Sequence, residues 1–388
     1  MRALHVIPAV APRYGGPSAS LLPMCAALAL RPGLRVEVAT TDADGSAGRL
    51  TAADLPAGDV PVHLFRRDWS ERWKYSRGLA AWLRRHAGDY DVLHVHAVWG
   101  HATAAACRAA RRAGVPVLLR PCGMLSDYSR RRSAWRKALY WRLVERPNLA
   151  AVRLFHATSA AEGRELEGLG LGVPAEVIPL GVDPQAWSQP RDPGALRERC
   201  GAAAGGRPVL LFLSRLHPKK GLADLLLPAM ARLRGDAFLA VAGGPDEHEP
   251  RYADAVRAEV ERLGLAGRVA LLGAVAPAQR WALLDGAAAF VLPSRSENFG
   301  VVVAEAMARG VPVVVSDSVQ SCEHVAVADS GRVVPLQVEA LADALDGLLA
   351  APELRQEMGR RGQDYARRHF AWPAIAECIA AAYTSCLG

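Results

Sequence analysis

Short apolar runs alternate with helical stretches along almost the whole chain, and this alternation restricts the possible folds. The strand-like runs of the first half are Ala3–Ile7, Leu34–Ala39, Val62–Phe65, Val92–Val95, Val115–Leu119, Leu154–Ala157 and Glu176–Ile178. Those of the second half are Val209–Leu213, Ala237–Ala242, Val269–Leu272, Ala288–Leu292 and Val311–Val315. Helical periodicity lies between them, for instance at Ala19–Leu30, Ser76–His86, Ala102–Arg112, Leu222–Leu233 and Ala253–Leu263. Repeated βα units predict an α/β fold with doubly wound parallel sheets and helices on both faces.

A chain of 388 residues is long enough for two domains, each with its own core. The boundary is expected at Val177–Pro184, because a loose stretch rich in Pro, Gly and Ala follows at Gln189–Arg207. We therefore predict two Rossmann-like domains, 1–182 and 183–370, that face each other across a cleft. A helix at 371–388 is expected to pack back on the first domain. Ligands of such sheets bind at the carboxyl ends of the strands.

Composition is that of a globular protein, with 22% charged and 51% apolar residues. Seven cysteines lie singly, without C-x-x-C spacing, which indicates free thiols in a reducing compartment. The first apolar run is too short for a signal peptide, and no window reaches roughly eighteen uncharged apolar residues. We therefore expect a cytoplasmic protein.

The net charge of +8 is unevenly distributed. Residues 1–180 hold 25 Lys and Arg against 15 Asp and Glu, which gives +10, whereas the remainder holds 22 against 24, which gives −2. The first half is therefore expected to meet an acidic ligand or a membrane surface.

A buried strand runs into a helix through the stretch Ser294–Gly310. The free N–H groups at the start of a helix suit an anion such as a phosphate. Glu297 lies in the loop and Glu305 lies eight positions later, in the helix. Carboxylates are poor ligands for phosphate, so these two are expected to bind hydroxyl groups of whatever carries it. The stretch predicts a site for a phosphorylated polyol.

Arg215 and Lys220 follow the first strand of the second half, on either side of a loop bent by a proline. A forked guanidinium and an ammonium together can neutralise a diphosphate. Two solvated loop cations are the alternative. Gly15 and Gly16 form the first βα turn, where the backbone can approach a ligand closely; a tight turn with an N-cap is the alternative there.

Alternation along a strand places His94 and His96 on one face, with His96 at the strand end and facing the cleft. A histidine there could polarise a hydroxyl or orient a sugar. Because no third ligand is evident, no metal site is predicted.

The segment 126–146 mixes seven basic residues with aromatic and aliphatic ones. Trp135, Leu139 and Leu143 share one side of a helix at i, i+4, i+8. Contact with an anionic membrane surface and an ordinary solvated helix remain equal alternatives. No nucleic-acid motif is present, so nucleic acid is not an expected partner.

Together these features resemble the family 4 glycosyltransferases, which have the two-domain GT-B fold and assemble bacterial exopolysaccharide or O-antigen. The resemblance covers essentially the whole chain, and its most specific part is the pair Glu297 and Glu305 around Asn298-Phe299-Gly300. Arg215 and Lys220 match the donor-diphosphate clamp of that family, and Gly15-Gly16 match its N-terminal glycine loop. The stretches His94–Trp99 and Gly123–Leu125 resemble its acceptor-side loops.

The resemblance implies a retaining hexosyltransferase that needs no metal or other cofactor. Its donor would be a nucleotide-diphosphate sugar, UDP- or GDP-linked, and its acceptor a glycan or lipid-linked saccharide. The implied roles are ribose binding by Glu305, sugar binding by Glu297, diphosphate stabilisation by Arg215 and Lys220, backbone N–H contacts from Asn298, Phe299 and Gly300, and orientation of the sugar or acceptor by His96.

Other functions remain open at this point. A sugar-nucleotide epimerase can share the architecture and would react with the donor alone. A phosphorylase would need a pyridoxal-binding lysine, which no segment suggests. A non-catalytic membrane-surface protein would use 126–146.

Overall fold

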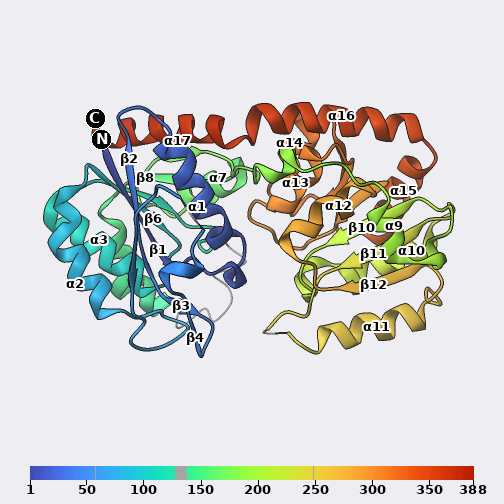
Figure 1. Cartoon of the computed structure of the whole chain (residues 1–388), viewed down its shortest axis with the longest axis horizontal. Coiled ribbons are helices and arrows are strands. Elements are labelled where there is room, and N and C mark those ends of the chain that lie inside the picture. The colour runs from blue at the N-terminus through green and yellow to red at the C-terminus, as the bar shows by residue number, and fades with distance from the viewer. Residues whose placement is uncertain (57, 127–137, 248) are drawn as a thin grey trace. The chain divides into compact units, whose positions relative to one another are not determined.

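The computed structural model describes residues 1–56, 58–126, 138–247 and 249–388. Contacts divide the chain into two compact units. Unit 1 consists of Met1–Gly181 together with Trp372–Gly388, and unit 2 of Val182–Ala371. Figure 1 shows a sheet with helices packed around it in each unit.

Unit 1 is built on a seven-stranded sheet with the order β5-β2-β1-β6-β7-β8-β9. Every neighbouring pair in it is parallel. Its strands are β1 (Arg2–Ala9), β2 (Arg35–Thr41), β5 (Val62–Phe65), β6 (Val92–His96), β7 (Val117–Arg120), β8 (Val152–Ala157) and β9 (Ala175–Val177). A small antiparallel pair, β3 (Ala43–Asp44) and β4 (Gly48–Arg49), lies outside this sheet.

The α-helices of unit 1 are α1 (Gly16–Ala29), α2 (Arg77–His86), α3 (His101–Ala113), α6 (Arg146–Leu149), α7 (Ala160–Glu167) and α17 (Trp372–Leu387). Shorter turns are η1 (Pro12–Tyr14), η2 (Ala52–Asp54), η3 (Ala87–Asp89) and the π-helical η4 (Trp141–Glu145). Helices α2 and α3 pack together, whereas α17 packs on α1 and on strands β6, β7 and β8 (Figure 1).

The two faces of the unit 1 sheet differ in chemistry. One face is apolar, because side chains such as Leu4, Val6, Leu93 and Val95 form a core with α2 and α3. The alternate positions of the central strands carry buried polar groups instead: His5, His94, His96, Arg120 and His156. Since successive side chains of a strand point to opposite faces, these polar groups share the other face.

Unit 2 is built on a six-stranded parallel sheet with the order β12-β11-β10-β13-β14-β15. Its strands are β10 (Val209–Leu213), β11 (Phe238–Ala242), β12 (Val269–Gly273), β13 (Ala289–Leu292), β14 (Val313–Ser316) and β15 (Gly331–Val334). Its α-helices are α8 (Gln185–Ser188), α9 (Ala195–Cys200), α10 (Leu227–Arg232), α11 (Tyr252–Arg262), α12 (Arg280–Asp285), α13 (Val301–Ala308), α14 (Cys322–Val327), α15 (Val338–Leu349) and α16 (Pro352–His369). The turns are η5 (Ala202–Ala204), η6 (Pro218–Lys220), η7 (Leu222–Leu226) and η8 (Pro277–Gln279).

These two parallel α/β sheets confirm the predicted fold class. All twelve strand-like runs of the sequence form strands, whereas β15 was not predicted. Its residues Gly-Arg-Val-Val follow Asp329 and Ser330, so the sequence there is typical of a loop. Pairing with β14 nevertheless makes it the edge strand of the unit 2 sheet.

The strand order of each sheet reverses direction at one point. In unit 1 the reversal lies between β1 and β6, and in unit 2 between β10 and β13. At such a point the loops from the two neighbouring strands leave in opposite directions and open a crevice at their carboxyl ends. We call these two places the switch points of unit 1 and unit 2.

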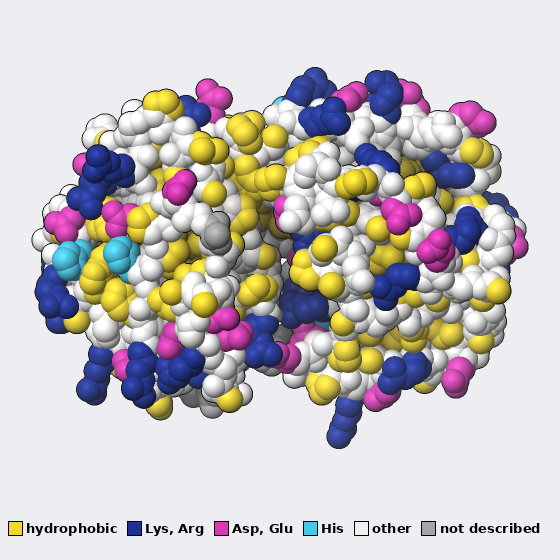
Figure 2. Space-filling model, viewed as in Figure 1, with side chains coloured by type: hydrophobic (Ala, Val, Ile, Leu, Met, Phe, Trp, Pro, Cys, Tyr) yellow, Lys and Arg dark blue, Asp and Glu magenta, His cyan; other side chains and the backbone are white. Residues whose placement is uncertain are grey.

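Within the described residues, no helix combines the length and apolar character needed to cross a bilayer. Figure 2 shows Lys and Arg side chains interspersed with Asp and Glu on the face in view.

Candidate functional site

The switch point of unit 2 brings together the loops that follow β10 and β13. Lys220, at the end of η6, forms an ion pair with Glu297, which lies between β13 and α13. The loops are also joined through their backbones, because the Arg295 N–H donates to Lys219 O over 2.7 Å. A side chain at Gly221, where φ is +70°, would clash with the carbonyl oxygen of Pro293. Glycine therefore allows this close approach.

The charges around Glu297 keep it ionised. Burial alone would raise the pKa of its carboxyl group, but Lys220, Lys219 and Arg215 outweigh that effect and hold the pKa below its ordinary value. The Lys220 side chain is only 9% exposed. Arg215 is different, since 60% of its side chain is exposed while its Nη1 donates to Asp246 Oδ2 over 2.6 Å. This switch point thus carries a buried cation, an accessible cation and an ionised carboxylate.

Helix α13 begins directly after this group. Gly300 precedes it in the left-handed region with φ +70°, and Phe299 is buried beside it. Gly300, Asn298 and Phe299 are therefore placed where the loop enters the helix, as the sequence predicts. The backbone N–H groups of the first turn of a helix are available for an anion or for hydroxyl oxygens.

Glu305 is buried in α13 and forms an ion pair with Arg280. Its Oε1 lies 3.1 Å from Arg280 Nη2, which is also 3.1 Å from Asp183 Oδ2. Burial raises the pKa of Glu305 to about 7, although Arg280 opposes this rise. The sequence did not indicate Arg280 or Asp183 as partners, because α12 and the start of unit 2 are distant from Glu305 in the chain.

The raised pKa of Glu305 predicts a stability that declines with pH. A carboxyl group whose pKa is higher in the folded state than in the unfolded state stabilises the folded state. This contribution is complete at a pH below the unfolded-state pKa of about 4.5, and it is lost as the pH rises through the folded-state pKa of about 7. Glu145, whose pKa burial also raises to about 7, acts in the same direction. We expect the melting temperature to fall between about pH 5 and pH 8, and to fall less in Glu305→Gln. If the melting temperature falls equally with pH in the wild type and in Glu305→Gln, the raised pKa does not belong to Glu305.

In unit 1, the loop after β1 carries Gly15 and Gly16. Gly15 adopts φ +85°, which only glycine enters without strain, and a Cβ built on either residue meets no atom within 4 Å. Helix α1 starts at Gly16, and the Ser18 hydroxyl ties it to β1 by donating to Ala9 O over 2.8 Å. The backbone of this turn therefore faces open space.

A cavity of about 680 Å³ opens beside this turn. It lies at the switch point of unit 1, because residues at the ends of β1 and β6 line it. Its aromatic residues are Tyr14, Trp73, Trp99 and Tyr140, and its cations are Arg72 and Lys74.

Four residues that line this cavity are non-glycine residues with positive φ: Lys74, Ala97, Trp99 and Cys122. Among the described residues only two others, Ser70 and Asp329, share this property. Strained backbone gathers at ligand sites more than elsewhere, so the cavity is the strongest candidate for a binding site in unit 1.

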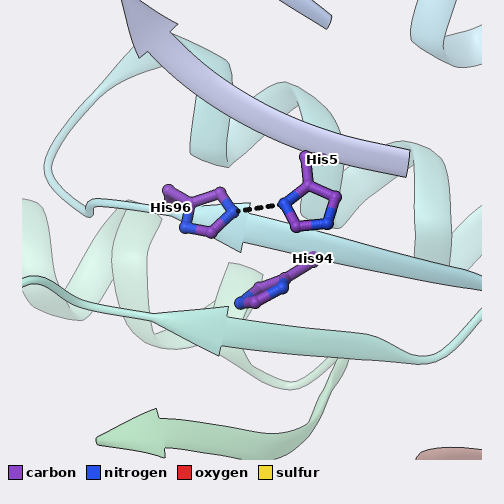
Figure 3. A group of neighbouring side chains, drawn as sticks. All are labelled: His5, His94 and His96. Atoms are coloured by element: carbon purple, nitrogen blue, oxygen red, sulfur yellow. Dashed lines mark hydrogen bonds between the residues drawn. The ribbon is translucent and has the colours of Figure 1, made fainter. Parts of the chain in front are cut away.

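His96 lies at the end of β6, but it does not face a cleft. Its side chain is fully buried, and its Nε2 lies 3.0 Å from Nδ1 of His5 (Figure 3). The prediction that His96 faces the cleft is therefore wrong. The prediction that His94 and His96 lie on the same face of the sheet is confirmed, since their ring centroids are 4.2 Å apart.

A third histidine does accompany His94 and His96, contrary to the sequence-based expectation. One ring nitrogen each of His5, His94 and His96 lies within 4.8 Å of the other two. The buried Arg120 guanidinium is close enough to lower the pKa of all three rings, and no carboxylate belongs to the group. A divalent cation is disfavoured beside a buried positive charge, so the set fits a hydrogen-bonded network better than a metal centre.

The predicted basic segment 126–146 lies partly outside the described residues, which omit 127–137. In its described part, Leu139 and Leu143 are 55% and 64% exposed, while Trp141 packs against the apolar core of unit 1. Contact with a membrane stays a prediction.

Two family models match the chain. The one described as "Glycosyl transferase 4-like domain" matches residues 15–181, and the one described as "Glycosyl transferases group 1" matches residues 199–365. The chain belongs to the group 1 glycosyltransferases. The resemblance seen in the sequence is thereby confirmed.

Curated members of this family are similar over parts of the chain. The "D-inositol 3-phosphate glycosyltransferase" of Segniliparus rotundus is 37% identical over 219 residues, which are 55% of this chain and 47% of that protein. The "GDP-mannose-dependent alpha-(1-6)-phosphatidylinositol monomannoside mannosyltransferase" of Mycobacterium tuberculosis is 31% identical over 236 residues, 58% of this chain and 59% of that protein. The chain thus spans about half the length of these two relatives.

Solved structures of glycosyltransferases share the fold along its whole length. Anabaena Alr3699/HepE in complex with UDP and glucose matches with a TM-score of 0.77 and 22% identity, covering 99% of this chain and 100% of that one. Sucrose-phosphate synthase from Thermosynechococcus elongatus matches with a TM-score of 0.75 and 22% identity, covering 99% and 98%. These matches confirm the predicted GT-B-like fold with two parallel α/β sheets.

Proposed function

We propose that the protein is a retaining glycosyltransferase that moves a hexose from a UDP- or GDP-linked sugar to a glycan or a lipid-linked saccharide. The observation that carries this proposal is the Lys220–Glu297 pair at the switch point of unit 2, with Arg215 beside it. A diphosphate leaving group needs cations, and the sugar attached to it needs a hydroxyl acceptor close by. This switch point offers both.

In the proposed donor complex, Arg215 and Lys220 stabilise the departing diphosphate. Such preorganised charge lowers the barrier because no solvent has to reorganise when the bond to the sugar breaks. Glu297 accepts hydrogen bonds from sugar hydroxyls, and Glu305 accepts them from the ribose. Backbone N–H groups from Asn298 to Gly300, at the entry to α13, donate to the sugar and phosphate.

We assign the acceptor to the cavity of unit 1, with the Gly15-Gly16 turn beside it. Aromatic faces such as Trp73 and Trp99 suit the apolar faces of sugar rings. Arg72 and Lys74 favour an acceptor that also carries an anionic group, for example a lipid phosphate. Relatives named for a phosphatidylinositol monomannoside and for the lipopolysaccharide core are consistent with such an acceptor.

The donor is tested with a panel of UDP-, GDP- and dTDP-sugars and the full-length protein. At least one is expected to raise the melting temperature, because a ligand that binds only the folded state stabilises it. Product formed from that donor without any acceptor would support an epimerase and overturn the proposal. The absence of stabilisation by every donor would overturn it as well.

The acceptor assignment is tested in the same assay with saccharides linked to a polyprenyl diphosphate or to phosphatidylinositol. Trp73→Ala should raise the acceptor KM by up to about tenfold, the upper end of an aromatic contact, and leave donor affinity unchanged. Trp69→Ala is the matched control, since Trp69 is 69% exposed and does not line the cavity. Equal acceptor KM values in the two variants would refute the assignment.

A further inference from the structure

The polar face of the unit 1 sheet holds a group of side chains that have no role in the transfer reaction proposed above. The group consists of His5, His94, His96 and His156 from three strands, and Tyr383 from α17. None of the five has any exposed surface. Buried polar groups are costly unless they are hydrogen-bonded, so the arrangement of their bonds indicates their purpose.

The hydrogen bonds form one chain that starts at a main-chain carbonyl. His156 Nε2 lies 2.8 Å from Ile178 O, and because a carbonyl can only accept, Nε2 must carry the proton. In a neutral ring Nδ1 is then an acceptor, and it lies 3.2 Å from His94 Nε2. His94 therefore donates from Nε2 and has its own acceptor at Nδ1.

Tyr383 lies between His94 and His5, and its hydroxyl group continues the donor-to-acceptor order of the hydrogen bonds. Its hydroxyl oxygen lies 3.0 Å from His94 Nδ1 and 2.9 Å from His5 Nε2. The single hydroxyl proton goes to His94, so the oxygen accepts from the N–H of His5. His5 Nδ1 then accepts from His96 Nε2 over 3.0 Å, the bond drawn in Figure 3. The carbonyl at one end thus determines the tautomer of every ring.

The tautomers are determined in this way only if all four imidazole rings are neutral, and the surroundings of the rings keep them neutral. Burial and, to a smaller extent, the Arg120 guanidinium lower the pKa of His5 and His156 to about 3. Burial likewise lowers the pKa of His94 and His96 well below the ordinary value, with smaller contributions from the neighbouring rings and Arg120. A proton added to the chain would be a second positive charge beside a buried cation.

The chain ends at Nδ1 of His96, a buried atom that has no hydrogen-bond partner among the described residues. Arg120 is its register partner on β7, and there Nε and Nη1 are likewise unpartnered within the described part of the chain. The next two residues after His96, Ala97 and Val98, line the cavity. The chain of hydrogen bonds therefore ends at the last residue of β6, directly before the segment that lines the cavity.

We propose that His5, His94, His156 and Tyr383 are positioning residues that hold His96 as the Nε2–H tautomer. They thereby fix the end of β6, from which Ala97 and Val98 continue into the lining of the cavity that we assign to the acceptor. The effect on sugar transfer rests on the proposed function, whereas the tautomers do not. Helix α17 is in this way part of the unit 1 site, through one hydroxyl group.

The tautomers can be measured directly in the full-length protein labelled with ¹⁵N-histidine. Long-range ¹H–¹⁵N correlation spectra distinguish protonated from unprotonated ring nitrogens. We expect His96 to carry its proton on Nε2 and none on Nδ1 throughout the neutral pH range. A proton on Nδ1 would overturn the proposal. Because this spectrum needs no transfer activity, its result is independent of whether the proposed function holds.

Tyr383→Phe interrupts the chain at its centre and removes only the hydroxyl group. We expect His96 to populate both tautomers and kcat to fall about ten- to hundredfold, with little change in the donor KM. Thr384→Val removes an exposed hydroxyl that donates to Ala380 O on the same helix, and should change neither quantity. If Tyr383→Phe keeps both the wild-type tautomer and kcat, the positioning role is refuted.

Discussion

Lys220→Met is expected to lower kcat by about 10²–10³-fold, the typical cost of removing one preorganised group that stabilises developing charge. Lys220 is buried at the switch point of unit 2, so no water is at hand to take over the role of its ammonium group. Methionine retains most of the side-chain volume, which separates the loss of charge from the loss of packing. Steady-state kinetics with the donor identified by the panel measures the effect.

The matched control for Lys220→Met is Arg232→Ala. Arg232 is a cation on α10, just after the Lys220 loop, but its side chain is 54% exposed and pairs with the exposed Glu339. We expect turnover close to wild type in this variant. Turnover within about threefold of wild type in Lys220→Met, with the wild-type circular dichroism spectrum, would show that Lys220 does not stabilise the leaving group.

Glu297→Ala is the companion to Lys220→Met. It should abolish turnover but leave nucleotide binding largely intact, because Glu297 is assigned to the sugar and Glu305 to the ribose. Loss of nucleotide binding as well would show that Glu297 acts through Lys220. A double substitution of both residues distinguishes these cases, since partners in one ion pair have non-additive effects.

Arg309→Ala is expected to destabilise unit 2 by up to about 3–5 kcal/mol, the cost of leaving a buried charge without its partner, because only the half-exposed Arg191 still pairs with Asp285. Arg309 and Asp285 have side chains that are each 1% exposed, and Arg309 Nε lies 2.7 Å from Asp285 Oδ1. Arg309 also donates to the carbonyls of Ala186, Gln189 and Pro190, at 3.0, 3.0 and 3.3 Å. It therefore anchors the first segment of unit 2 to the end of α13.

Thermal unfolding measures this effect, and a fall of roughly 10 °C in Tm corresponds to it for a domain of this size. Arg234→Ala is the control, since Arg234 pairs with Asp346 while its own side chain is 76% exposed. Exposed pairs contribute less than about 1 kcal/mol. A similar small shift in both variants would show that the buried pair adds little beyond its desolvation cost.

The sequence was sufficient for the fold because its signals are local. Each strand from Ala3–Ile7 to Val311–Val315 is a short apolar run bounded by loop residues, and such runs are recognisable without tertiary information. β15 was missed because its pairing with β14, rather than its composition, makes it a strand. The placement of Lys220 and Glu297 at the carboxyl edge of one sheet also followed from local pattern.

The polar network of unit 1 could not be predicted in the same way. Its members come from β1, β6, β8 and α17, and His5 and Tyr383 are 378 positions apart. Only their three-dimensional arrangement shows that they bond to one another. One signal was available: His5 interrupts the apolar run Ala3–Ile7, and a polar residue in the middle of a buried strand calls for a partner. Arg280 was missed for a similar reason, because it meets Glu305 only in the folded unit.

The place of Tyr383 in the sequence has a consequence for how the protein is made. The sheet and most helices of unit 1 leave the ribosome first, but α17 is synthesised only after all of unit 2. Until α17 has been synthesised, unit 1 contains His5 and His94 but lacks the Tyr383 hydroxyl group that forms hydrogen bonds with both rings. Unit 2, which is continuous in sequence, can complete its fold before unit 1 does. Helix α17, which is synthesised after unit 2, thus completes a unit whose other elements precede unit 2 in the sequence.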